Sequence, residues 1–130
     1  MRSVRAGGDV PATKGLRSFA QDRSYPVRAA VEPAVSVVFE IDIGELHAPT
    51  RRSARAAFAR QVAMYLSHVA CGLSLAEVSS VFARDRSTVA HACELVEDRR
   101  DDPVLDAKLE YLERAVSALL GALSLQRGRQ

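Results

Sequence analysis

The chain has 130 residues, of which 48% are hydrophobic and 26% charged, and its formal net charge is +2. This length accommodates one domain of roughly a hundred residues and a tail, which leaves no room for a second, catalytic domain. No apolar run approaches the roughly 20 residues of a membrane span, and the basic N-terminus lacks the apolar stretch of a secretory signal, so we expect a cytoplasmic protein.

The first segment, residues 1–28, mixes Arg, Gly, Pro, Ser and Asp without periodicity, and we interpret it as a disordered basic arm. From Ala29 to Phe39 the pattern is ambiguous, because its valines favour a strand while its alanines tolerate a helix. Pro33 suits the first turn of a short helix, where its missing N–H costs nothing. Ile41 to Leu46 then indicates a turn that packs back on the core.

The segment from Ser53 to Cys71 predicts an amphipathic helix, because its apolar residues recur at helical spacing and Gly72 supplies a C-terminal stop. The two cysteines, Cys71 and Cys93, lack CxxC spacing and have apolar neighbours. We therefore expect reduced, buried thiols, with no metal site and no cofactor.

Ser74 and Glu77 have the spacing of a capping box, which opens a helix of two to three turns. A turn from Arg84 to Ser87 leads into a further helix, which we expect to bury Val89, Ala92, Cys93 and Val96. Its outward residues are then Arg86, Ser87, Ala90, His91 and Glu94. A short capped helix, a tight basic turn and a second helix that opens with hydroxyl side chains are typical of a helix-turn-helix that meets DNA.

The last helix is expected to start at Asp102-Pro103, where an N-cap residue precedes a proline at the first helical position. Its apolar stripe consists of Leu105, Leu109, Leu112, Val116, Leu119 and Leu123. The chain is thus predicted to be a small all-α domain over residues 29–125 that contains a helix-turn-helix, followed by a disordered tail over residues 126–130.

Charge is distributed unevenly along the chain. Arg51, Arg52, Arg55 and Arg60 occur without an intervening acid, and Arg84 and Arg86 follow in the predicted turn. The stretch from Glu94 to Glu113 is rich in acidic residues instead. One face of the domain should therefore attract phosphate and another repel it.

Three stretches in this order carry a resemblance to a known family: Ala59 to Leu66, Leu73 to Val78 and Arg84 to Cys93. They resemble the C-terminal DNA-binding domain of the bacterial chromosomal replication initiator DnaA, and the match extends upstream to Val31. The resemblance implies an all-helical domain that reads the major groove of duplex DNA with one helix and reaches the minor groove with a basic side chain.

The chain also departs from that family. The full initiator carries a nucleotide-binding motor with a phosphate-cradling loop, whereas no GxxxxGK[ST] motif occurs here, so we expect no nucleotide and no enzymatic activity. The family usually has His where Arg86 stands and Thr where Ser87 stands. These positions read bases, so the preferred DNA sequence need not be that of the initiator.

The candidate contacts divide by groove. Arg86 opens the recognition helix and can bond O6 and N7 of guanine, or else pair with Asp85 or a phosphate. The resemblance assigns base contact to Asp85, and the alternative role for its carboxylate is to cap the helix. Ser87 and Thr88 would meet phosphate or thymine, and the remaining expected contacts to the DNA backbone are Arg84 and His91.

Residues 51–55 resemble the basic loop of the family. Within it, Arg52 matches the family position for minor-groove insertion, where a guanidinium senses groove width. Arg51, Arg55 and Arg60 are expected to position the duplex through phosphate contacts. Of these, Arg60 is expected to hold every duplex similarly.

Three functions compete at this point. The leading interpretation is a sequence-specific double-stranded DNA-binding protein of the nucleoid that regulates transcription. A second is a modulator of replication initiation that competes for origin sites. A third is a protein-interaction module in which the C-terminal leucines bind a partner, and the sequence leaves the oligomeric state open.

Overall fold

The computed structural model describes residues 23–48 and 53–128 of the chain. Every regular element in these two ranges is a helix, which confirms the all-α prediction. In chain order the elements are α2 (Ser24–Phe39), α3 (Ile43–Leu46), α4 (Ala54–Tyr65), the π-helical segment η1 (Leu66–Ala70), α5 (Leu75–Phe82), α6 (Arg86–Arg99) and α7 (Pro103–Gly128).

Helix α2 settles the ambiguous segment and corrects two boundaries. It begins at Ser24, inside the segment predicted as an arm over residues 1–28, and residues 1–22 of that arm lie outside the described residues. Pro33 lies inside the helix and not in its first turn. Burial decides for a helix here, because Val27, Ala30, Val31 and Val35 lie on one helical face and all enter the core.

The predicted helix from Ser53 to Cys71 is confirmed, with a change of pitch near its end. Ser53 caps α4, since its Oγ accepts a hydrogen bond from Ala56 N at 3.0 Å. Cys71 N–H then donates to the carbonyl of Leu66 at 3.0 Å, a bond that spans five residues and defines the π turn of η1. Gly72 has a φ of 80° and ends the helix, as its lack of a side chain permits.

The helix-turn-helix follows, and its capping box is present. Ser74 Oγ accepts from Glu77 N at 3.1 Å, and Glu77 Oε1 accepts from Ser74 N at 2.8 Å. Helix α5 ends at Ala83, which has a left-handed φ of 54°. Helix α6 begins at Arg86 with Asp85 at the N-cap position, so the turn is shorter than predicted.

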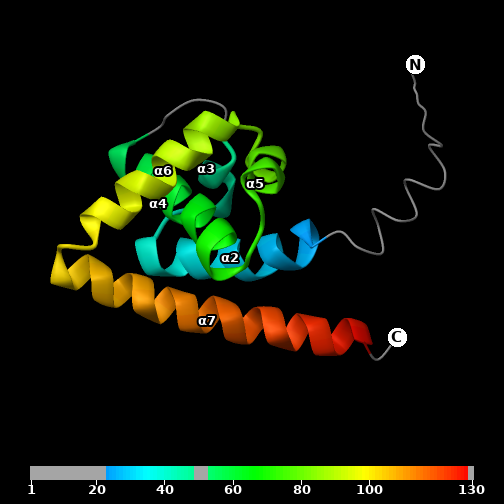
Figure 1. The fold of residues 1–130 in the computed structure, drawn as a ribbon. Coiled ribbons are helices and arrows are strands. Elements are labelled where there is room, and N and C mark those ends of the chain that lie inside the picture. Colours follow the sequence, from blue (N-terminus) through cyan, green and yellow to red (C-terminus); the bar gives the residue numbers. More distant parts are fainter. Residues whose placement is uncertain (1–22, 49–52, 129–130) are drawn as a thin grey trace, which may run out of the picture.

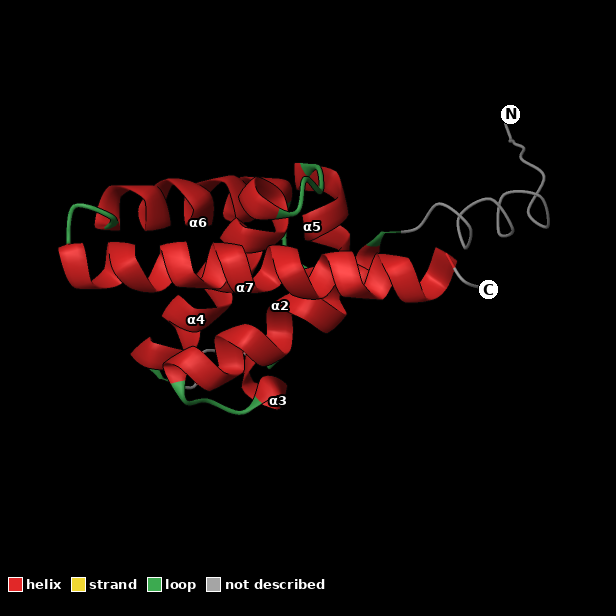
Figure 2. Cartoon of the chain, turned by 90° about the horizontal axis from the view of Figure 1, so that it is seen from below, coloured by secondary structure: helices red, strands yellow, loops and turns green. Residues whose placement is uncertain are grey.

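Helix α7 runs antiparallel to α2 along one side of the domain (Figure 1). Seen from below, it crosses the domain in front of the other helices (Figure 2). Its N-cap is confirmed, because Asp102 Oδ1 accepts from Val104 N at 3.0 Å. The helix continues to Gly128, so residues 126–128 of the predicted tail over residues 126–130 are helical, and the last two residues lie outside the described ranges.

A single core collects side chains from the helices. Helix α4 packs against α2, α3 and α6, and its Val62, Ala63 and Met64 are buried. The apolar stripe of α7 contributes Leu105, Leu109, Leu112 and Val116, whereas Leu119 remains 43% exposed. Within the described ranges, no helix combines the length and apolar composition needed to cross a bilayer. Helix α6 contributes Val89, Ala92 and Val96 to this core, whereas its first three residues lie exposed at the surface.

Candidate nucleic-acid interface

The N-terminal end of α6 presents polar groups to solvent. Asp85, Arg86, Ser87 and Thr88 are all exposed. The first helical hydrogen bond runs from Val89 N to Asp85 O at 3.0 Å, so the three preceding amides have no acceptor within the helix. Free amides and the helix dipole make such an end favourable for phosphate or for base acceptors.

The sequence left two roles within the protein open for these side chains: an ion pair between Arg86 and Asp85, and a helix cap by Asp85. No ion pair joins Arg86 to Asp85 or to another residue in the described part of the chain. Asp85 stands at the N-cap position, yet its carboxylate makes no capping hydrogen bond. Both side chains are therefore available to an external ligand.

Two further candidates also lie open to solvent. His91 is exposed one turn further along α6, on the same face as Ser87. Arg55 is exposed in the first turn of α4. Neither side chain has a hydrogen-bond partner among residues 23–48 and 53–126. Arg51 and Arg52 lie outside the described residues.

Arg84 is only partly available. Its Nη2 donates to the carbonyl of Ala48 at 3.1 Å, and the side chain is half-buried. Its main chain is held as well, because Arg84 N donates to the carbonyl of Ser79 at 3.1 Å and Ser79 Oγ donates back to the carbonyl of Arg84. Nη2 of Arg84 is therefore occupied by the main chain, and the contact of this residue to phosphate stays a prediction.

Arg60 does not lie where the sequence analysis expected it. The residue is only 7% exposed, and its Nε and Nη2 donate to the carbonyls of Leu46 and Glu45 at 3.0 and 2.9 Å. Burial, and secondly the nearby positive charge of Arg84, lowers the pKa of Arg60. Its guanidinium is occupied by main-chain acceptors, so Arg60 is corrected from a phosphate contact to a residue that supports the fold.

The other end of α6 carries the opposite charge. Glu94, Asp98, Asp101 and Asp102 are exposed, and so is Glu110 on α7. The arginines of this region are engaged elsewhere: Arg99 lies 4.8 Å from the ring centre of Phe58, and Arg100 pairs with Asp106 and Glu113. A polyanion is thus attracted to the start of α6 and repelled from its end.

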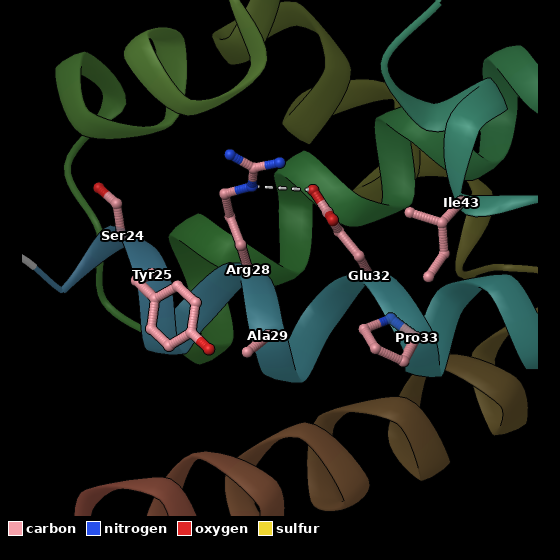
Figure 3. Close-up of a pocket in the computed structure, with 7 residues that line it drawn as sticks. All are labelled: Ser24, Tyr25, Arg28, Ala29, Glu32, Pro33 and Ile43. Carbon is pink, nitrogen blue, oxygen red and sulfur yellow. Dashed lines mark hydrogen bonds and ion pairs between the residues drawn. The ribbon is translucent and has the colours of Figure 1, made fainter. Parts of the chain in front are cut away.

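The sequence did not predict a polar cluster that joins α2 to the residue after α3. Glu32 is buried and forms an ion pair with Arg28 at 3.2 Å (Figure 3). Its Oε2 also contacts Nε2 of His47. The His47 ring stacks on Phe82 with its centroid 5.5 Å away. Glu32 lies on the apolar face of α2, and an acid on such a face was the available signal for a buried partner.

The thiols and possible metal ligands add no second site in the described part of the chain. Cys71 and Cys93 are free and half-buried, and burial raises the pKa of Cys71 to about 11 and also raises that of Cys93. No group of three or more His, Cys, Asp or Glu side chains in this part has a geometry suited to a metal ion. The start of α6 is the candidate interface.

Residues 29–96 match the family model for the bacterial DnaA protein helix-turn-helix. Over 90 residues the chain is 31% identical to the chromosomal replication initiator protein DnaA of Desulfotalea psychrophila and 38% identical to that of Acinetobacter baumannii. Each alignment covers 68% of this chain and 19% of the relative, so the chain spans about a fifth of the length of these relatives.

Solved structures agree with the sequence match. A crystal structure of a DNA replication initiation factor superposes with a TM-score of 0.68 at 27% identity, covering 82% of this chain and 33% of that one. The replication initiator DnaA bound to AMPPCP and single-stranded DNA gives a TM-score of 0.66 at 26% identity, with coverage of 82% and 32%. The matched family model ends within α6, so α7 lies outside it.

Proposed function

The chain belongs to the bacterial DnaA helix-turn-helix family, and from this premise we propose that it binds duplex DNA sequence-specifically and modulates replication initiation by competing for origin sites. The observation that carries the proposal is the exposed N-terminal end of α6, with its free amides and with an Arg86 that has no ion pair among residues 23–48 and 53–128. A domain of this family seated on an origin site would exclude another initiator molecule from that site.

The matched relatives favour this function over transcriptional regulation. The relatives described above are named as chromosomal replication initiators, and none of these names refers to a transcription factor. The interpretation that led the sequence analysis therefore receives no support from the comparisons. Footprints of the protein at the origin and at promoters distinguish the two functions, and we expect protection at the origin.

We assign the contacts by accessibility. Arg86, Asp85, Ser87 and Thr88 read base edges in the major groove, where a good bidentate pair discriminates by about 1–3 kcal/mol. Arg55 and His91 contact the DNA backbone, together with Arg51. Arg52 enters the minor groove, as the resemblance implies. Arg60 is left out of this set because its guanidinium is buried.

Selection of bound sequences from random duplexes, followed by affinity measurements over a salt series, tests the proposal. Arg86→Ala should relax the preference at one base position, because a contact to a base edge is lost. Arg114→Ala is the matched control, since Arg114 is exposed on α7 and its removal changes the net charge equally.

Two results would contradict the proposal. One is a folded wild-type protein that binds no duplex more tightly than it binds heparin, an unrelated polyanion. The other is an equal loss of affinity in Arg86→Ala and Arg114→Ala, with preference unchanged in both. In that case binding follows net charge alone, and α6 does not read bases.

A further inference from the structure

Three of the four consecutive residues from Glu45 to Ala48 are held by arginines that come from other elements. Arg60 of α4 donates to the carbonyls of Glu45, at 2.9 Å, and of Leu46, at 3.0 Å. Arg84, in the turn of the helix-turn-helix, donates to the carbonyl of Ala48 at 3.1 Å. We call residues 45–48 the anchored segment.

The remaining member of the anchored segment, His47, is held through its side chain. Its Nε2 pairs with the carboxylate of Glu32 on α2 and lies 3.3 Å from Nη2 of Arg28. Its ring lies on that of Phe82, the last residue of α5, with an interplanar angle of 9°. The anchored segment therefore contacts α2, α4, α5 and the turn that precedes α6.

The anchored segment depends on these contacts because it cannot stabilise itself. Helix α3 has only four residues, too few to be stable alone. Leu46 and Ala48 are buried, so their carbonyls require hydrogen-bond donors from the protein. Guanidinium donors supply strong, charge-assisted bonds with a fixed fork geometry.

The hydrogen bond from Arg84 to the carbonyl of Ala48 connects two segments that are expected to contact DNA. Arg84 lies two residues before Arg86, which opens the recognition helix, and its main chain is fixed to Ser79 on α5. Ala48, which Arg84 holds, lies three residues before Arg51 and four before Arg52. One side chain thus joins the two parts of the chain to which DNA contact is assigned.

We infer that Arg84 is a positioning residue: through Ala48 it fixes where the basic loop starts relative to the recognition helix. The inference rests on the proposed DNA-binding function and replaces the expected phosphate contact of Arg84. Removing Arg84 then weakens binding chiefly because the loop arginines are displaced. It follows that Arg84 matters only while those arginines are present.

A double-mutant cycle tests this dependence. Arg84→Met is introduced into the wild type and into a background that carries Arg51→Ala and Arg52→Ala, and affinity for the selected duplex is measured over a salt series. In the wild type we expect a loss of roughly tenfold or more, as for a lost base or groove contact. In the loop-variant background we expect a change of less than about twofold, because coupled residues are not additive.

A direct phosphate contact by Arg84 predicts a different pattern. The loss would then be equal in both backgrounds, and the salt slope would fall by a further ~0.9 in each. That result would overturn the inference. Arg86→Ala is the control within the cycle, since Arg86 acts in the major groove and should weaken binding by the same factor in both backgrounds.

Stability is followed in parallel by thermal unfolding. A general loss of folded protein would lower affinity in both backgrounds, so it cannot imitate the expected pattern. Arg84→Gln is carried through the same cycle as a milder variant, and the outcome is taken from whichever variant is folded at the assay temperature. If the wild type itself does not discriminate between duplexes, the proposed function fails, whatever the role of Arg84.

Discussion

Arginine residues in this chain differ in what their guanidinium groups contact. Arg86 and Arg55 are exposed and have no partners in the described part of the chain, which suits a surface for polyanions. Arg60 and Arg84 donate to main-chain carbonyls, and Arg100 pairs with two carboxylates. The arginines of this sequence therefore include residues exposed to solvent and residues that support the fold.

Arg60→Met should lower the free energy of unfolding by about 2–3 kcal/mol, because the buried carbonyl of Leu46 and the half-buried carbonyl of Glu45 lose donors from a charged group. Chemical denaturation followed by circular dichroism measures this. Arg55→Ala is the control and should change stability by less than about 0.5 kcal/mol, since Arg55 is exposed. An Arg60→Met protein as stable as the wild type, with a reduced salt slope for DNA, would restore the phosphate contact that we exclude.

At the scale of elements, helix ends decide how the helix-turn-helix is shaped. The capping box of Ser74 and Glu77 starts α5 with two reciprocal bonds. The other end of α5 closes at Ala83 in a left-handed conformation that L-residues adopt at a cost. The tight turn after Ala83 delivers Asp85 to the N-cap of α6 and leaves Arg86 at the surface.

Ala83→Gly should therefore raise the free energy of unfolding by about 0.5–1 kcal/mol, because glycine adopts the left-handed region without strain. The same substitution at Ala107, which is exposed inside α7, should lower it by about 0.5–1 kcal/mol, since glycine disfavours a helix interior. Thermal and urea unfolding of the two variants give the opposite signs directly. Equal destabilisation in both would show that Ala83 is not strained.

At the scale of the whole molecule, the domain depends on a helix that the family match does not include. Residues 29–96 carry the match, whereas α7 begins at Pro103. Leu109, Leu112 and Val116 of α7 are nevertheless fully buried against the rest of the core. The matched region thus exposes a large apolar surface unless α7 covers it.

A chain that ends after Asp102 should therefore fail to fold. Burial of a large apolar side chain contributes about 1.5–3 kcal/mol, so the loss of several consumes most of the 5–15 kcal/mol that stabilises a typical domain. A chain that ends after Ala118 retains the buried leucines and is the control. Near-native circular dichroism and cooperative melting of the shorter chain would contradict this role of α7.

Local signals in the sequence determined much of the architecture. Helical periodicity, the capping box, the Gly72 stop and the Asp102-Pro103 start depend on residues three or four positions apart, and each of these features is present. The order of the motifs also sufficed to identify the family, which the comparisons confirm. The exposure of Arg86 followed from the periodicity of α6 alone.

Tertiary structure alone decided the rest. The hydrogen bond from Arg60 to Leu46 joins residues 14 apart, and the one from Arg84 to Ala48 joins residues 36 apart. A local sequence pattern therefore predicts neither of these two bonds. The same holds for Glu32 and His47, and for α2, whose valines suit a strand until burial of one helical face favours a helix. Sequence specifies which groups can donate and accept, but only the packed fold determines which of them meet and which remain exposed to solvent.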